Sequence, residues 1–311
     1  MKNTKIAVVQ EQAIHLDLSA SLQKAISCIE SASKANAQIA VFGECWLSGY
    51  PAWIDYIPNL GKWDHEPVKS TWAKLFENSL SIQSEEMEQL CNAASENNII
   101  VVMGFHEAIV VGKGNSTLYN SFVIINHDGK ILNHHRKLMP TYNEKLIHGL
   151  GDGAGLKAVD TSAGRLGGLI CWEHFMPLNR QALHDEGEDI HFALWPMCKE
   201  RHLLASRHYA FEGRCYVVAV GQIMQVKDVP SKLEHPESWT DPSQFILDGG
   251  SCVIGPDAQY LLEPQYGNAD IFYVDLPNKT SLLKERMNLA TSGHYQRYDI
   301  FDLKINKNRP F

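Results

Sequence analysis

The chain has 311 residues, of which 44% are hydrophobic and 21% are charged, a composition typical of folded globular proteins and not of disordered ones. Its formal net charge is -8, which excludes the basic surface that nucleic acid or an anionic membrane would require. We therefore expect a small-molecule substrate and no nucleic-acid or membrane partner.

Cysteine usage and hydropathy predict the compartment. The chain has seven cysteines. An odd number without the close spacing of small disulfide-rich domains predicts free thiols in a reducing environment. No stretch approaches the roughly 18 apolar residues of a membrane-spanning helix, and the first apolar run is too short for a signal peptide. These features favour a cytoplasmic protein.

The hydrophobic pattern begins with a strand at 6–9, a helix at 22–35 and a strand at 39–42, which together predict a βαβ unit. A long connection follows at 46–72, carries four of the tryptophans and is interrupted by prolines such as Pro67. An irregular segment of this length is typical of a binding or covering loop. The alternative is that its aromatic side chains only pack against the body of the protein or a second subunit.

Strands and helices continue to alternate along the rest of the chain. We predict strands at 99–105, 119–126, 131–134, 156–160, 166–170, 190–195, 216–220, 251–254, 259–262 and 271–274, and helices at 85–96, 179–185 and 199–214. The glycine-rich run at 149–155 is not expected to bind phosphate, because no helix follows it. Without a linker or low-complexity break, the pattern favours one layered α/β domain with its helices outside.

Cys171 is the first candidate for chemistry, because it comes directly after the apolar run that ends at Ile170. A free cysteine is usually just a small buried hydrophobic residue. Open α/β sheets, however, place their reactive groups at the carboxyl ends of strands. Gly167 and Gly168 are expected to leave room for another backbone or a substrate to approach closely.

Two other charged residues follow predicted strands in the same way: Glu44 after the strand at 39–42, and Lys137 after the strand at 131–134. A nearby ammonium would favour the cysteine thiolate and could stabilise negative charge on an intermediate. A nearby carboxylate could act as general base and then as general acid. Taken singly, each is more often a solvated loop residue, so only the combination favours catalysis.

Four motifs in the chain resemble the carbon-nitrogen hydrolase superfamily and, within it, the nitrilase branch. They are Phe42-Gly43-Glu44 with Gly49-Tyr50-Pro51, the run His135-Arg136-Lys137-Leu138-Met139-Pro140-Thr141, the segment Gly151-Asp152-Gly153, and the block Cys171-Trp172-Glu173-His174. The resemblance covers most of the chain. It implies a four-layered α-β-β-α sandwich, formed by residues 1–311 as a single domain with a short C-terminal tail from about residue 293.

The resemblance also implies a site and a mechanism. Glu44, Lys137 and Cys171 match the family's catalytic triad, and Glu144 matches its second glutamate. Cys171 would attack a nitrile carbon to give a thioimidate and then a thioester, with Lys137 and the backbone N–H of Trp172 stabilising the tetrahedral intermediates. The residues expected to line the substrate pocket are Trp172, His174, Tyr50, Trp195, Pro196 and Met197. No cofactor and no metal are implied, and the partners are a small nitrile, water, and further copies of the chain in a homodimer or larger homo-oligomer.

Several alternatives remain at this point. Cyanide dihydratase and aliphatic amidase activities share the triad chemistry. A zinc hydrolase could use Cys171 with His174, or Cys198 with His202, although neither pair has the paired-cysteine spacing of structural zinc sites. A non-catalytic assembly module is the remaining alternative, and the presence of all four expected catalytic residues argues against it.

Overall fold

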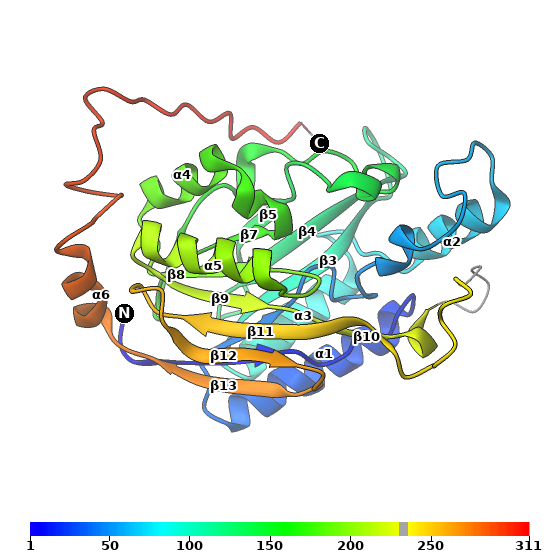
Figure 1. The fold of residues 1–311 in the computed structure, drawn as a ribbon, viewed down its shortest axis with the longest axis horizontal. Helices are drawn as coiled ribbons and strands as arrows, with labels where there is room; N and C mark the ends of the chain where they lie inside the picture. The colour runs from blue at the N-terminus through cyan, green and yellow to red at the C-terminus, as the bar shows by residue number, and fades with distance from the viewer. Residues whose placement is uncertain (230–235, 311) are drawn as a thin grey trace.

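The computed structural model describes residues 1–229 and 236–310, and these fold around two β-sheets packed face to face (Figure 1). The first sheet has the order β13 (Ile271–Leu276), β1 (Thr4–Val9), β2 (Ile39–Phe42), β3 (Ile100–Ile109), β4 (Thr117–Ile125) and β5 (Ile131–Arg136). Its strands β1, β2 and β3 are parallel, whereas β13, β4 and β5 add antiparallel pairs.

The second sheet has parallel strands at its centre. Its order is β10 (Ile223–Gln225), β11 (Phe245–Ile254), β9 (Tyr216–Val220), β8 (Ile190–Leu194), β7 (Gly164–Ile170) and β6 (Val159–Thr161), with β12 (Tyr260–Tyr266) also paired to β11. Strands β7, β8 and β9 run parallel, and the outer strands are antiparallel. Both sheets are therefore mixed.

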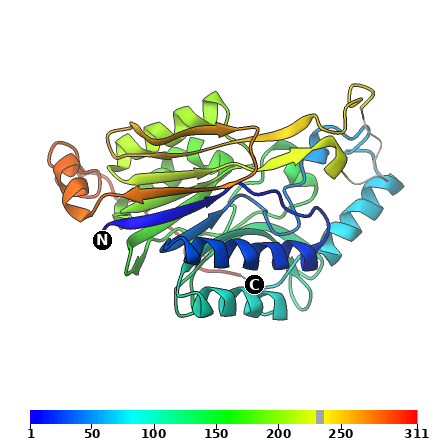
Figure 2. The same ribbon diagram turned by 90° about the horizontal axis from the view of Figure 1, so that it is seen from below.

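Helices cover the outer face of each sheet, as the edge-on view in Figure 2 shows. Helices α1 (Leu18–Lys34) and α3 (Glu85–Glu96) pack on the first sheet, and α4 (Pro177–Glu186) and α5 (Glu200–Gly213) pack on the second. Two further helices, α2 (Glu66–Glu77) and α6 (Lys279–Arg286), lie outside these layers. The predicted four-layered α-β-β-α sandwich is confirmed.

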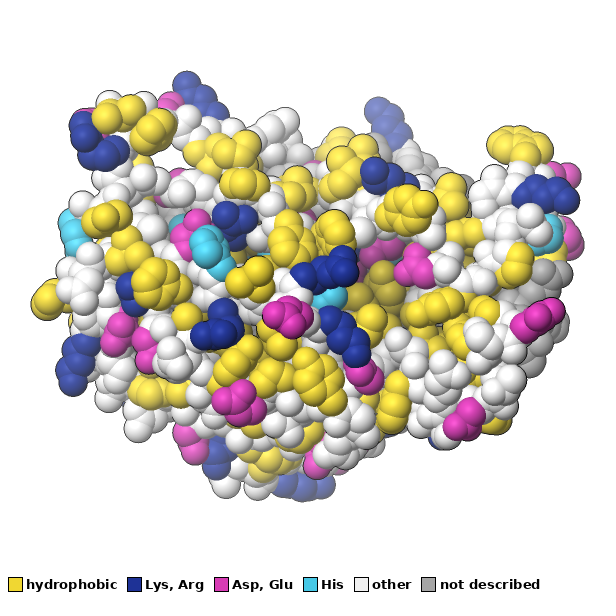
Figure 3. Space-filling view, viewed as in Figure 1, with side chains coloured by type: hydrophobic (Ala, Val, Ile, Leu, Met, Phe, Trp, Pro, Cys, Tyr) yellow, Lys and Arg dark blue, Asp and Glu magenta, His cyan; other side chains and the backbone are white. Residues whose placement is uncertain are grey.

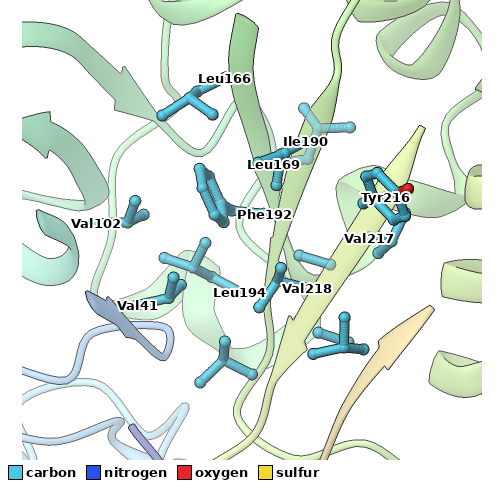
Figure 4. Close-up of a cluster of buried hydrophobic side chains, with 14 of the residues drawn as sticks. Val41, Val102, Leu166, Leu169, Ile190, Phe192, Leu194, Tyr216, Val217 and Val218 are labelled. Atoms are coloured by element: carbon cyan, nitrogen blue, oxygen red, sulfur yellow. The ribbon is translucent and has the colours of Figure 1, made fainter. Parts of the chain in front are cut away.

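Successive side chains along a strand point to opposite faces of the sheet and therefore belong to different hydrophobic cores. In β1, Ile6 and Val8 belong to the core between the sheets, whereas Ala7 and Val9 belong to the core under α1 and α3. Figure 4 shows the core between the sheets, where Val41 and Val102 of the first sheet lie among side chains of the second. Burial on both faces explains why these strands read as continuous apolar runs in the sequence.

The segment 46–72 is not irregular throughout, because helix α2 begins at Glu66. Pro67 lies in the first turn of α2, where proline is well tolerated because it lacks only an N–H that would be unpaired there. The aromatic side chains of the segment differ in burial. Trp53 is 1% exposed and belongs to a loop core, whereas Trp63 is 94% exposed.

Three further details differ from expectation. The strand predicted at 156–160 starts only at Val159 and forms the short strand β6, because residues 156–158 have no regular structure. Gly167 makes room for a side chain and not for a substrate, since a Cβ there would lie 1.8 Å from Glu188 Oε1. Strand β10 and helix α6 had no sequence prediction.

None of the helices in residues 1–229 and 236–310 combines the length and apolar character that a membrane span needs.

Candidate active site

Cys171 occupies a sharp turn between a strand and a 3₁₀ helix. Strand β7 ends at Ile170, and the 3₁₀ helix Cys171–Phe175 begins at once. The backbone φ of Cys171 is +51°, in the left-handed region that non-glycine residues rarely adopt. Such strain costs on the order of 1–3 kcal/mol and occurs frequently at functional sites. Cys171 is 3% exposed and lines a cavity.

Glu173 holds this turn against the end of β5. Its carboxylate accepts hydrogen bonds from the backbone N–H groups of Ile170 and Leu138, each at 2.8 Å, and interacts with His135 Nε2 at 2.9 Å. One buried side chain thus ties the strand end that carries Cys171 to the segment that carries Lys137. Sequence reasoning quoted Glu173 only as part of a motif, although an ionisable residue so close to the cysteine was a usable signal.

Glu44, Lys137 and Glu144 form a buried ion cluster beside Cys171. Lys137 Nζ lies 2.8 Å from Glu44 Oε1 and 2.7 Å from Glu144 Oε2. All three side chains are at most 1% exposed. Glu44 and Lys137 follow the carboxyl ends of β2 and β5, and Glu144 lies in the 3₁₀ helix Tyr142–Leu146. The structure therefore brings together the four residues expected to be catalytic.

Three polar residues orient this cluster. Tyr50 donates its hydroxyl proton to Glu144 Oε1 at 2.8 Å, and Asn120 Nδ2 donates to Glu44 Oε1 at 2.7 Å. Gln222 Nε2 donates to the backbone carbonyl of Glu44. Among the described residues, Glu44 Oε2 has no hydrogen-bond partner although it is buried. One oxygen of Glu44 is thus fixed by two donors, and the other is left as a proton acceptor.

Asn120 and Gln222 had no sequence prediction. Asn120 is a buried polar residue within the apolar strand β4, which was a detectable anomaly in the sequence. Its partner, however, comes from a distant loop. Gln222 follows β9, and nothing in its local sequence indicates contact with Glu44.

Burial dominates the ionisation of the site. It raises the pKa of Glu44 to about 7, because the Lys137 ammonium only partly offsets the effect of desolvation on this pKa. The nearby Glu144 charge raises the pKa of Glu44 further. Burial and the Glu44 carboxylate also raise the pKa of the Cys171 thiol well above its usual range, although Lys137 opposes them. Burial alone would lower the pKa of Lys137, but Glu144 and Glu44 raise it well above normal. Lys137 thus favours the thiolate, as expected, but burial and Glu44 outweigh it and favour the thiol form of Cys171.

A cavity of about 230 Å³ opens onto this cluster. Of the residues predicted to line a substrate pocket, Tyr50, Trp172, Pro196 and Met197 do so. Residues without a sequence prediction complete the wall, namely Ala52, Ile54, Asp55, Tyr56, Thr141, Tyr142, His202, Ile246 and Leu247. A larger hollow of about 480 Å³ lies elsewhere, lined by residues such as Glu107 and Arg136, and it contains none of the four candidate catalytic residues.

His174 and Trp195 do not line the cavity, and this part of the expectation is corrected. His174 is 1% exposed, and its Nδ1 lies 2.7 Å from the backbone carbonyl of Cys171. Its Nε2 contacts His191 Nε2 at 2.9 Å, and its ring stacks on Trp195. The turn that exposes Cys171 to the cavity buries its neighbour behind it. His174 is thus placed to hold the backbone of the turn.

The cysteine–histidine pairs considered for zinc do not form a metal cluster in the part of the chain that is described. His174 contacts the carbonyl of Cys171, and His202 Nδ1 accepts a hydrogen bond from the backbone of Lys199. The cluster of three potential metal donors found in the described ranges consists of Cys45, His106 and His148.

Comparisons with known proteins agree with the fold. The family model described as carbon-nitrogen hydrolase matches residues 5–284. A cyanide hydratase from Stereum hirsutum is 35% identical over 98% of this chain and 84% of its own length, and an aliphatic nitrilase from Rhodococcus rhodochrous is 34% identical over 97% and 79%. A carbon-nitrogen hydrolase structure from Helicobacter pylori G27 has a TM-score of 0.70 at 17% identity, covering 92% of this chain and 93% of its own. The Nit3 structure from Saccharomyces cerevisiae also has a TM-score of 0.70, at 20% identity, with 96% and 97% covered.

Proposed function

Because the chain belongs to the carbon-nitrogen hydrolase family, within its nitrilase branch, we propose that it hydrolyses an organic nitrile to a carboxylic acid and ammonia through a covalent intermediate on Cys171. The observation that carries this proposal is the buried ammonium of Lys137 between two carboxylates, next to a strained cysteine in a cavity. Arylacetonitrilases at 33–34% identity are further relatives of the same kind.

In the first half of the reaction, Glu44 Oε2 accepts the thiol proton as the sulfur of Cys171 attacks the nitrile carbon. The carbon–nitrogen triple bond becomes a double bond, and the nitrogen takes that proton from Glu44 to give a thioimidate, which restores the Glu44 carboxylate. This order follows from the raised thiol pKa, since a protonated thiol needs a base at the moment of attack. The unpartnered oxygen of Glu44 is the acceptor available for it.

The second half consumes two water molecules. The first adds to the thioimidate carbon while Glu44 takes a proton, and the tetrahedral intermediate then expels ammonia with a proton from Glu44. The remaining thioester reacts with the second water, which releases the carboxylic acid and restores the thiol. Lys137 stabilises the negative charge of the tetrahedral intermediates. Glu144, held by Tyr50, keeps the Lys137 ammonium in place.

Activity is expected to fall as the pH drops through about 7, because Glu44 acts as a base and its pKa is raised to about 7. Below that pH, kcat/KM should fall by about tenfold per pH unit as Glu44 becomes protonated. Initial rates of ammonia release measured across about pH 3.5 to 9 check this, with circular dichroism at each pH as the control for folding. An acidic limb near the ordinary glutamate value of about 4.3 would contradict the assignment.

The cavity predicts a small substrate. Its volume of about 230 Å³ lies below the roughly 300–1,000 Å³ typical of sites for drug-sized ligands. We therefore expect short aliphatic nitriles to be hydrolysed faster than arylaliphatic ones. A panel of both classes, with the matching amides and free cyanide, should be scored for acid, amide and ammonia together. Faster turnover of cyanide would favour a cyanide hydratase, faster turnover of amides would favour an amidase, and faster turnover of arylaliphatic nitriles would refute the size argument.

A second copy of the chain is the partner that we propose. Helices α4 and α5 expose Leu178 at 67%, Leu204 at 69% and Phe211 at 46%. On the face in Figure 3, apolar side chains are interspersed with charged ones. Such a mixed surface is compatible with pairing between two sandwiches.

We also propose that residues 1–311 form one domain with a tail from about residue 293. We propose further that the protein is cytoplasmic, as its seven free cysteines suggest.

A further inference from the structure

Cys45, His106 and His148, here called the Cys45 cluster, lie close together under the loop that carries Glu44. They are 0%, 1% and 5% exposed, respectively. Each residue offers one potential ligand atom, which is the sulfur of Cys45 or one ring nitrogen of each histidine. These three atoms all lie within 4.8 Å of one another. Neither the triad nor the cavity wall uses any of the three.

The hydrogen bonds of His106 leave a lone pair directed into the cluster. Its Nε2 lies 3.0 Å from the carbonyl oxygen of Gly49. A carbonyl only accepts hydrogen bonds, so Nε2 carries the ring proton and Nδ1 carries a lone pair. That Nδ1 lies 3.0 Å from His148 Nε2. Histidines that bind metals are commonly held in this way, with the second ring nitrogen donating to a backbone carbonyl.

Two buried histidine nitrogens, one in the cluster and one beside the same loop, lack hydrogen-bond partners among the described residues. Among the described residues, His148 Nδ1 has no hydrogen-bond partner. His15 packs on the same loop, since a Cβ on Gly49 would lie 2.2 Å from His15 Nδ1, and its Nε2 is also buried without a partner in the described ranges. Buried polar atoms are nearly always satisfied in native proteins, so the unsatisfied His148 Nδ1 indicates a missing partner at the cluster.

We propose that the Cys45 cluster binds one thiophilic cation of the zinc class. A thiolate with two imidazoles is a donor set that suits zinc, and zinc would displace the thiol proton of Cys45 to solvent on binding. The fourth position falls to a water molecule. This site is separate from the zinc-hydrolase alternative considered above, because it shares no residue with it and leaves Cys171 free as the nucleophile. It revises the expectation that the protein holds no metal.

The cation would join two segments that carry candidate catalytic residues to strand β3, which carries His106. Cys45 directly follows Glu44, and Gly49 directly precedes Tyr50. The backbone N–H of His148 donates to the carbonyl of Glu144 at 2.8 Å. A cross-link at this point would fix the distances between the Glu44 loop, β3 and the 3₁₀ helix of Glu144. The expected role is structural, and its detection does not depend on the proposed nitrile chemistry.

The test uses the full chain without an affinity tag, produced with zinc in the medium and then dialysed against a weak chelator. Elemental analysis is expected to find about one zinc per chain, and replacement by cobalt should produce a thiolate-to-cobalt charge-transfer band. Cys45→Ser should reduce the bound zinc to less than about a tenth of an equivalent and remove the band. Cys252→Ser, which alters another buried free cysteine in β11, should keep both.

The proposal is overturned if the wild-type protein retains neither metal, or if Cys45→Ser keeps the same zinc content. Where Cys45→Ser does not fold, the cobalt spectrum of the wild-type protein decides, since a site without thiolate coordination gives no such band. A strong chelator should also lower the unfolding temperature of the wild-type protein. His148→Gln provides a second variant and should lose the metal as well.

Discussion

Replacement of Cys171 by alanine is expected to abolish nitrile turnover, with kcat falling by at least about 10³-fold, while the protein stays folded. No other group in the cavity wall can form the thioimidate, because the remaining cysteines do not line it. The fold should persist because the substitution removes one sulfur atom and keeps the side chain small and apolar. Alanine can also keep the positive φ at the same backbone cost, since both residues carry a Cβ.

The measurement combines ammonia release with intact-protein mass spectrometry of enzyme that is quenched during turnover. The wild-type chain should gain the mass of an acyl group, and the variant should not. Cys252→Ala is the matched control, because Cys252 is equally buried but lies in β11, outside the cavity wall. It should keep activity within a few-fold. If Cys171→Ala retains turnover, the nucleophile assignment is wrong, and if it loses its fold, the expectation that the fold tolerates the substitution is wrong.

Strand ends made the catalytic cluster predictable. Glu44 follows the apolar strand β2 and Cys171 follows the apolar end of β7, whereas Lys137 follows β5, which ends in polar residues. The hydrogen bond from Lys137 Nζ to Glu44 Oε1 shows that the ends of β2 and β5 come together. An abrupt change from apolar to ionisable residues at a strand end is a local signal that the sequence carries directly. Glu144 has no such signal, because it lies in a 3₁₀ helix, and only the family resemblance pointed to it.

Contacts across the fold were not predictable from local patterns. Asn120 bonds to Glu44 only because β4 lies near the loop that follows β2, and that proximity is a property of the whole sandwich. His174 was assigned to the pocket because it is near Cys171 in sequence. At a turn with positive φ, neighbouring side chains separate, and His174 points behind the cysteine to contact its carbonyl oxygen.

The strain at Cys171 and the buried charges beside it depend on the same supports. Glu173 accepts hydrogen bonds from both strand ends, which keeps the turn and Lys137 in register. The ion cluster in turn needs its ammonium, because two carboxylates are buried around it. Stability and catalysis are therefore coupled at Lys137 more strongly than at Cys171.

Lys137→Met is expected to destabilise the protein by about 3–5 kcal/mol near pH 8 and to lower kcat by about 10²–10³-fold. Methionine keeps much of the lysine side-chain volume but removes the charge, so Glu44 and Glu144 would face each other without a counter-ion. In the wild-type protein, the Lys137 ammonium lowers the pKa of Glu44. Without this ammonium, the pKa of Glu44 should rise further in the variant. Since a raised pKa favours the folded state only while the group is protonated, the free energy of unfolding of the variant should fall as the pH rises from about 4.3, the unfolded value, to beyond 7.

Urea denaturation at a series of pH values measures this directly, in parallel with the wild-type protein. Lys145→Met is the matched control, because Lys145 lies in the same 3₁₀ helix as Glu144 but is exposed, and its loss should change stability by less than about 0.5 kcal/mol. The loss in free energy of unfolding that Lys137→Met causes should become smaller on acidification, since protonation then neutralises the carboxylates that the missing ammonium left unpaired. A deficit that is independent of pH would mean that lost packing, and not the two unpaired carboxylates, causes the destabilisation.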